Sequence, residues 1–111
     1  GSDTAPNPQE LLMAALNACL TVAYVAVAAS KGIKVNSLKI ETSGELDLRG
    51  FLGLDENVNP GYDSVQYTAF IDADAQPAEI EEIHQAVLKT SPNYANFSRS
   101  IKMEPKLVIA Q

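Results

Sequence analysis

The sequence predicts an α+β domain: a long buried central helix and a second, amphipathic helix pack on a small, mostly antiparallel sheet. Three observations predict this fold. Residues 7–29 form a nearly uninterrupted apolar helical run, and residues 77–91 repeat apolar side chains at helical spacing. Three further segments alternate apolar and polar residues as half-buried strands do. The expected order is α-β-β-α-β, within a single domain spanning residues 1–111.

Length and charge narrow the function classes. A chain of 111 residues suffices for one domain with a modest core. Its net charge of −6 repels phosphates, so nucleic acid is not an expected partner. One cysteine and one histidine offer no metal-ligand spacing, and we expect neither metal nor cofactor. The lone cysteine and the lack of a signal-peptide pattern favour a cytoplasmic setting.

The first helix has clear start and stop signals. Asn7 is a good N-cap, Pro8 suits the first helical position, and Glu10 completes a capping-box spacing. Gly32 can adopt the left-handed conformation that ends a helix, with Lys31 placed favourably against the helix dipole. We therefore expect one continuous helix between these caps.

Two readings of this apolar helix must be weighed. Between Leu11 and Ala29 only Asn17 and Thr21 are clearly polar, which is long enough for a membrane span. Seven of these positions are alanine, however, and no basic cluster flanks the run. The sequence therefore favours a buried helix in a protein without a membrane partner.

In each of the three predicted strands, apolar residues recur mainly at every second position. The first covers residues 35–48, with Gly44 as a bulge, the second residues 65–71, and the third residues 101–109, at an edge because of Pro105. Between the first two lies a loop, residues 49–63, whose apolar side chains are expected to fold back onto an apolar surface. These side chains are Phe51, Leu52 and Leu54.

The second helix begins at Pro77 and ends near Ser91, because Pro92 disfavours helical geometry in the residue before it. Residues 93–98 are expected to form a short turn. The inward side of this helix is expected to carry Ile80, Ile83, Val87 and Leu88.

One amphipathic helix and three strands cannot enclose a helix that is apolar on every side. The uncovered area would reach several hundred Å², which is unusual on a soluble monomer. At about 25 cal/mol per Å², this area favours association by many kcal/mol. We therefore expect an obligate homodimer with the first helix at its centre.

Three strings of the sequence carry a family resemblance. TAPNPQELLMAALNACL, the later KGIKV, and TSPNYANFSRSIKME resemble the OsmC/Ohr superfamily of osmotically inducible and organic-hydroperoxide-resistance proteins. The resemblance covers the chain from residue 4 onward. It implies an intertwined α+β homodimer, in which two long apolar helices pack centrally under sheets from both subunits. The strands that precede the Asn-Pro pair in the family are absent from this sequence.

The resemblance also implies a chemistry. In the peroxidase branch, the cysteine matching Cys19 attacks a hydroperoxide and becomes a sulfenic acid. The second cysteine of that branch corresponds to Ser91, so this chain is a one-cysteine variant that needs an external thiol reductant. In the family a carboxylate directly follows the Asn-Pro pair. In this sequence Gln9 occupies that position, and the acidic Glu10 comes one residue later. Its activating arginine has no counterpart, and Arg99 is the one candidate substitute.

The residues themselves leave alternatives open. Cys19 is either the reactive centre or a small core residue, since its apolar neighbours disfavour a charged thiolate. Glu10 lies about 13 Å from Cys19 along the helix and caps the helix or serves the site. Ser91 either ends a helix or contacts Cys19. His84 is expected to be a partly packed surface residue, and Tyr94 and Phe97 could line an apolar pocket.

Three functions therefore compete. The first is a thiol-dependent peroxidase of the stress response that reduces organic hydroperoxides. The second is a non-enzymatic dimeric module that binds a small hydrophobic ligand. The third is a purely structural part of a larger protein.

Overall fold

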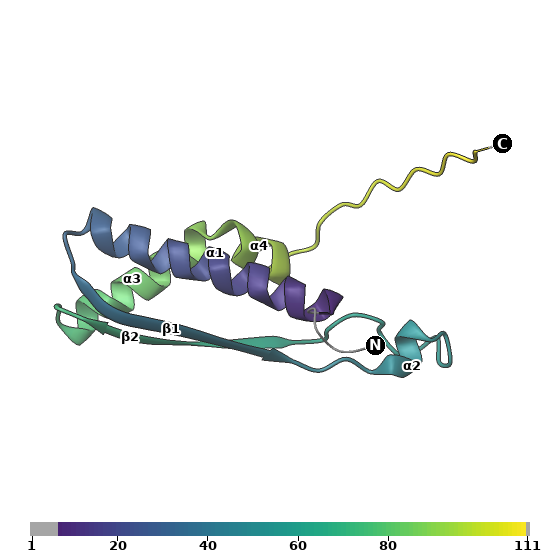
Figure 1. Ribbon diagram of the computed structural model, residues 1–111, viewed down its shortest axis with the longest axis horizontal. Coiled ribbons are helices and arrows are strands. Elements are labelled where there is room, and N and C mark those ends of the chain that lie inside the picture. Colours follow the sequence, from purple (N-terminus) through teal and green to yellow (C-terminus); the bar gives the residue numbers. More distant parts are fainter. Residues whose placement is uncertain (1–6, 111) are drawn as a thin grey trace.

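The computed structural model describes residues 7–110. Over this range the chain forms four helices and two strands, and α1 lies along the sheet with α3 and α4 packed beside it (Figure 1). The α+β class is confirmed. The elements are α1 (Pro8–Ser30), β1 (Val35–Gly44), α2 (Leu48–Phe51), β2 (Val65–Ala73), α3 (Pro77–Thr90) and α4 (Pro92–Ser98).

Helix α1 is capped as its sequence predicts. The Asn7 side chain accepts a hydrogen bond from the Glu10 N–H at 2.9 Å and donates one to the Glu10 carboxylate at 3.0 Å. At the other end Gly32 has φ +69°, and its N–H donates to the Ala29 carbonyl. The Ile33 N–H donates to the Ala28 carbonyl, which completes a Schellman motif.

Strands β1 and β2 pair antiparallel, with Leu38 opposite Ile71 and Ile40 opposite Ala69. The half-buried residues of β2 alternate from Val65 to Ala73, as predicted. The bulge predicted at Gly44 is wrong, because the register shifts between residues 35 and 37 instead. Gly44 ends β1, and a Cβ there would come within 2.9 Å of the Tyr62 ring.

The predicted extension of the first strand to residue 48 is also wrong, since Leu48 begins α2. The apolar side chains that follow do not fold back: Phe51 is 75% exposed, and Leu52 and Leu54 are exposed too. Backbone packing and polar contacts close this loop instead. A Cβ at Gly50 would lie 2.8 Å from the Asn59 carbonyl oxygen, so two passes of backbone already touch there.

Helix α3 ends one residue before Ser91, as Pro92 predicts, and buries Ile83 and Val87. The turn expected over residues 93–98 is wrong, because Pro92–Ser98 forms the helix α4. The Ser91 hydroxyl accepts the Tyr94 N–H, and proline fits the first helical position. The proline that ends one helix therefore begins the next.

The strand predicted over residues 101–109 is not formed among the described residues. Residues 99–110 are exposed and lead away from the rest of the fold (Figure 1). The radius of gyration is 18.0 Å, whereas a compact chain of this length has about 13 Å. The alternating sequence favours an extended backbone, but within the described residues this segment pairs with neither β1 nor β2.

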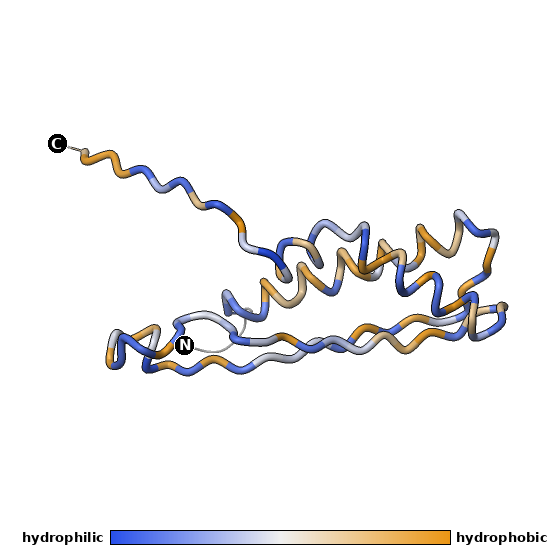
Figure 2. The backbone as a smooth tube through the Cα atoms, turned by 180° about the vertical axis from the view of Figure 1, so that it is seen from behind, coloured by the Kyte–Doolittle hydropathy of each residue, from blue (hydrophilic) through white to orange (hydrophobic). Residues whose placement is uncertain are grey.

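The core lies between one side of α1 and α3, over the sheet. Its buried members are Leu16, Leu20, Tyr24, Ala28, Ile83 and Val87. Figure 2 shows hydrophobic colour along most of α1, yet large side chains on its other side stay exposed, among them Val22 at 68%. By length and composition alone α1 could also cross a membrane, a test that core helices of soluble proteins pass too. Its packing on the sheet and α3 fits the predicted core helix.

Candidate functional site

Cys19 and Ser91 lie together where α1 meets the junction of α3 and α4. The Cys19 sulfur is 3.5 Å from the Ser91 hydroxyl oxygen. Cys19 is half-buried, while Ser91 is only 2% exposed. The Ser91 oxygen accepts the Tyr94 N–H at 3.2 Å, and either the Ser91 hydroxyl or the Cys19 thiol can donate in the contact between them. Of the two predicted readings of Ser91, the structure combines both: it caps a helix and contacts the thiol.

Asn93 fixes α4 beside the thiol, a role that the sequence analysis did not assign. Its side-chain amide donates to the Ala15 carbonyl at 3.3 Å, one turn before Cys19 on α1. An asparagine in the first turn after the Ser-Pro pair is the signal that could have indicated it. Together Ser91 and Asn93 hold the start of α4 against α1.

The other two predicted site residues lie elsewhere in this copy of the chain. Glu10 is exposed and bonded to Asn7, so its observed contacts are those of a helix cap. Arg99 is exposed at the C-terminal end of α4, and it makes no ion pair within residues 7–110. Any role of either residue at the Cys19 sulfur stays a prediction.

A second polar group lies within the core, on the same helix as Cys19. The Tyr24 hydroxyl is 2.6 Å from His84 Nδ1 and 2.9 Å from the Tyr67 hydroxyl. Burial raises the pKa of Tyr24 well above its ordinary value, and the hydrogen bond with Tyr67 raises this pKa further. His84, expected to be a partly packed surface residue, is half-buried and bonded to Tyr24 here. The position of Tyr24 four residues after Leu20 was the signal for its burial.

An apolar pocket of about 570 Å³ opens between the N-terminal half of α1, α4 and the start of β2. The prediction that Tyr94 and Phe97 line such a pocket is confirmed. Leu12, Leu16 and Tyr67 also line it, and Tyr67 packs edge-on against Tyr94 with 6.4 Å between ring centroids. This volume falls in the range of small-molecule sites.

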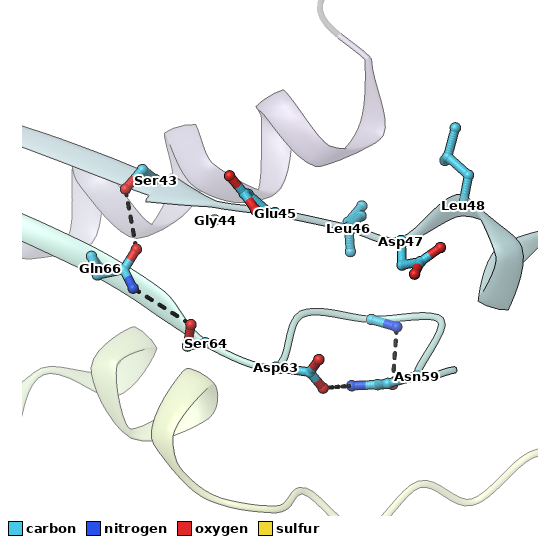
Figure 3. Close-up of a pocket in the computed structure, with 11 residues that line it drawn as sticks. Ser43, Gly44, Glu45, Leu46, Asp47, Leu48, Asn59, Asp63, Ser64 and Gln66 are labelled. Carbon is cyan, nitrogen blue, oxygen red and sulfur yellow. Dashed lines mark hydrogen bonds between the residues drawn. The ribbon is translucent and has the colours of Figure 1, made fainter. Parts of the chain in front are cut away.

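A second pocket, of about 970 Å³, is polar and lies where β1 ends and the 45–63 loop begins (Figure 3). Its acidic side chains are Glu45, Asp47 and Asp63, and hydrogen bonds to Arg49 lower the pKa of Asp47 to about 2. Neither Cys19 nor Ser91 lines it. Within residues 7–110, no three His, Cys, Asp or Glu side chains are grouped as metal ligands.

Two solved structures are similar to this fold. An OsmC-like protein from Mycoplasma pneumoniae matches with a TM-score of 0.73 and 21% identity, over 86% of this chain and 66% of that one. An OsmC-like protein of unknown function from Vibrio cholerae matches with a TM-score of 0.57 and 16% identity, over 82% of this chain and 58% of that one. This chain therefore spans less than two thirds of either structure. No curated protein matches it.

The similar structures show the fold, and the match of the sequence to a family model shows the family. A family model described as OsmC-like protein matches residues 1–106, which is nearly the whole chain. The lone Cys19 and the Ser91-Pro92 pair both lie within the match. The resemblance inferred from the sequence is confirmed, and the chain belongs to the OsmC-like protein family.

Proposed function

We propose that this protein is a cytoplasmic thiol-dependent peroxidase that reduces organic hydroperoxides with Cys19 as its one redox cysteine. The observation that carries the proposal is the 3.5 Å contact between the Cys19 sulfur and the Ser91 hydroxyl. Membership in the OsmC-like family, a family of redox and stress proteins, supports the same chemistry. Cys19 is half-buried rather than fully enclosed, which is compatible with approach of a small substrate.

The reaction balances with an external thiol. The Cys19 thiolate attacks the terminal oxygen of the hydroperoxide, the O–O bond breaks, and the alkoxide leaves as an alcohol after taking up a proton. Sulfur is oxidised to sulfenic acid. One external thiol then displaces water to form a mixed disulfide, and a second thiol releases reduced Cys19 and a small disulfide.

Ser91 is the proposed partner of the sulfur in this cycle. Its hydroxyl can donate to the thiolate, which has no proton of its own, while its oxygen keeps accepting the Tyr94 N–H. Glu10 and Arg99 are proposed to contribute across the interface of a homodimer, since neither contacts Cys19 within one copy.

The exposed side of α1 supports this homodimer. It carries an apolar row at alternating spacings of four and three residues, the spacing of a helix–helix seam. Small side chains within the row allow close approach of a second helix. The row, called the outer row below, consists of Leu11, Ala15, Ala18, Val22, Val25 and Ala29.

The peroxidase proposal is tested by following consumption of an aromatic hydroperoxide in the presence of an external thiol. Wild type should turn over, and Cys19→Ser should lose at least 100-fold in rate. In parallel, a thiol reagent is titrated against native and denatured protein across pH. A thiol that reacts only after unfolding would rule out the peroxidase.

Ser91 provides two matched variants. Ser91→Ala should lower the rate about tenfold while leaving Cys19 accessible, since one hydrogen bond to a charged group is worth about 1.5–3 kcal/mol. Ser91→Cys should form a disulfide with Cys19 after one equivalent of hydroperoxide, visible as a loss of two hydrogens by mass spectrometry. Accumulation of free sulfenic acid in that variant would contradict the proposed proximity.

The apolar pocket favours one alternative, a non-enzymatic module that binds a small hydrophobic ligand. Its aromatic lining and its volume of about 570 Å³ suit such a ligand. Saturable binding of a hydrophobic dye that Cys19→Ser leaves unchanged and Phe97→Asp abolishes, without any hydroperoxide turnover, would favour this function over the first.

A further inference from the structure

The apolar pocket between α1, α4 and the start of β2 adjoins the Cys19–Ser91 contact. Leu16, which lines the pocket, precedes Cys19 on α1 by three residues, which is about 4.5 Å along the helix axis. Tyr94 also lines it and donates its N–H to the Ser91 hydroxyl. What this pocket binds therefore bears on what reaches the thiol.

The pocket has an apolar interior and a polar mouth. Five of its apolar and aromatic side chains belong to the core cluster or pack against it: Leu16, Val65, Tyr67, Tyr94 and Phe97. Its polar side chains other than tyrosine are all exposed. They come from the first turn of α1, the loop before β2 and the last turn of α4, which lie toward the same end of the fold (Figure 1). These polar residues are Gln9, Asp63, Ser64, Asn96 and Ser98.

Asp63 gives this mouth a negative charge. It is the one charged residue among those that line the pocket within residues 7–110. Its carboxylate accepts a hydrogen bond from the Asn59 side-chain amide at 3.1 Å, which holds it on the loop (Figure 3). The neighbouring polar pocket shares Asp63 and Ser64 with this one and adds the carboxylate of Glu45.

The cations nearest in the sequence leave the mouth acidic. Arg49 is paired with the Asp47 carboxylate, the third acid of the polar pocket. Arg99 directly follows Ser98 at the end of α4, yet among the described residues it lines neither pocket. Because an acidic surface around an apolar pocket repels anions, a carboxylate head is disfavoured at this mouth.

We propose that this pocket binds amphiphilic small molecules with an apolar body and an uncharged or positively charged head, and that Asp63 selects against a carboxylate head. The apolar interior supplies most of the binding, because burial of apolar surface is favourable whatever the head group. Asp63 decides between ligands that share the same body. For the peroxidase proposed above, on which this last step rests, the preferred substrates are hydroperoxides of neutral molecules such as esters rather than of free fatty acids.

Three unreactive ligands with ten-carbon chains test the selection. At neutral pH methyl decanoate is uncharged, decanoate is an anion and decylamine is a cation. Each is titrated against protein that carries Nile red, an uncharged dye, and its Kd follows from displacement. Loss of dye binding in Phe97→Asp assigns the dye to the pocket. Wild type should bind decylamine and methyl decanoate at least tenfold more tightly than decanoate.

Asp63→Asn is the informative variant, because the amide keeps an oxygen for the Asn59 hydrogen bond while it removes the charge. It should tighten decanoate binding about three- to tenfold, weaken decylamine binding by a similar factor and leave methyl decanoate within about twofold. Asp55→Asn removes the same charge from the same loop, and Asp55 lines neither pocket. This control should match wild type for all three ligands.

Equal Kd values for decanoate and methyl decanoate in wild type would overturn the inference. The same holds if Asp63→Asn and Asp55→Asn give the same Kd values for all three ligands. Tight binding of decanoate that Arg99→Gln abolishes would also overturn it, since the mouth would then recognise anions.

Turnover separates this inference from the peroxidase proposal. A fatty-acid hydroperoxide and its methyl ester differ only in the head, and wild type should show the higher kcat/KM for the ester. Asp63→Asn should narrow this ratio about three- to tenfold, whereas Asp55→Asn should not change it. If neither hydroperoxide is consumed while the three ligands follow the expected order, only the peroxidase proposal is contradicted. Consumption of both hydroperoxides with equal kcat/KM in all three proteins contradicts the selection alone.

Discussion

The two sides of α1 differ in what covers them, although both are apolar. The inner side places Leu16, Leu20, Tyr24 and Ala28 four residues apart, and the protein's own α3 and sheet bury all of them. The outer row alternates spacings of four and three residues, and it is exposed. Rows four residues apart suit packing between crossing helices, whereas the alternating spacing suits two nearly parallel or antiparallel helices.

This difference shows why hydrophobicity alone is an incomplete guide to burial. The elements within residues 7–110 cover only one side of this helix. The remaining side can be stable in water only if a further surface covers it. On the inner side the hydroxyl of Tyr24 is bonded twice, to Tyr67 and to His84.

The largest expected effect is on the inner side. Leu20→Ala removes a fully buried side chain and should lower the free energy of unfolding by about 2–5 kcal/mol. Urea denaturation at a fixed protein concentration measures the loss. Leu11→Ala makes the same change on the outer row, where 55% of the side chain is exposed, and should cost less than half as much. Equal losses would contradict the division between the two sides.

On the outer row, introducing a charged side chain should weaken association of the proposed dimer, whereas shortening an apolar side chain should have little effect. Val22→Glu places a carboxylate in the middle of the proposed helix–helix seam, where it would lose water without gaining a partner. We expect the dimer to dissociate at least 100-fold more readily, which is about 2.8 kcal/mol. Sedimentation over a range of concentrations measures this, while far-UV circular dichroism should stay unchanged. A variant with wild-type association would remove the seam from the interface.

The hydroxyl of Tyr24 joins the inner side to α3 and β2. Tyr24→Phe leaves His84 Nδ1 and the Tyr67 hydroxyl without this partner and should cost about 1–3 kcal/mol. The folded pKa of Tyr24 is raised, so its contribution is complete below pH of about 10 and is lost as pH rises toward that folded pKa.

Wild type should therefore lose stability above pH of about 10 more steeply than Tyr24→Phe does. Thermal unfolding followed between pH 8 and 11 measures the two slopes. Tyr62→Phe is the matched control, because the Tyr62 hydroxyl makes no hydrogen bond within the described residues, and it should behave as wild type. Parallel slopes for all three proteins would contradict the role of the buried hydroxyl.

The smallest expected loss of stability is at the C-terminal end of α1, at Gly32. Gly32 has φ +69° and open space around its Cβ position, so Gly32→Ala should cost only the backbone strain of about 1–2 kcal/mol. Denaturation should show this loss with no change in association. Gly61→Ala, where no left-handed backbone is required, should stay within about 0.5 kcal/mol of wild type. A neutral Gly32→Ala would mean that the helix end can rearrange.

The sequence by itself determined the features that depend on neighbouring residues. The ends of α1 follow from Asn7 and Gly32, and the end of α3 follows from Pro92, because caps and breakers act within one turn. The faces of β1 and β2 follow from a two-residue period. The same local signals misassigned residues 93–98, where the proline that ends α3 also begins α4.

Only the tertiary structure decided which surfaces are closed and which residues meet. Cys19 and Ser91 are 72 residues apart in the chain, and Asn93 meets Ala15 across a similar separation. No local pattern encodes such contacts, because they depend on how α1, α3 and α4 pack. The exposure of Phe51 and of residues 99–110 has the same origin. An apolar side chain is buried only where the fold brings a surface to it, and within residues 7–110 the fold brings none to these two segments.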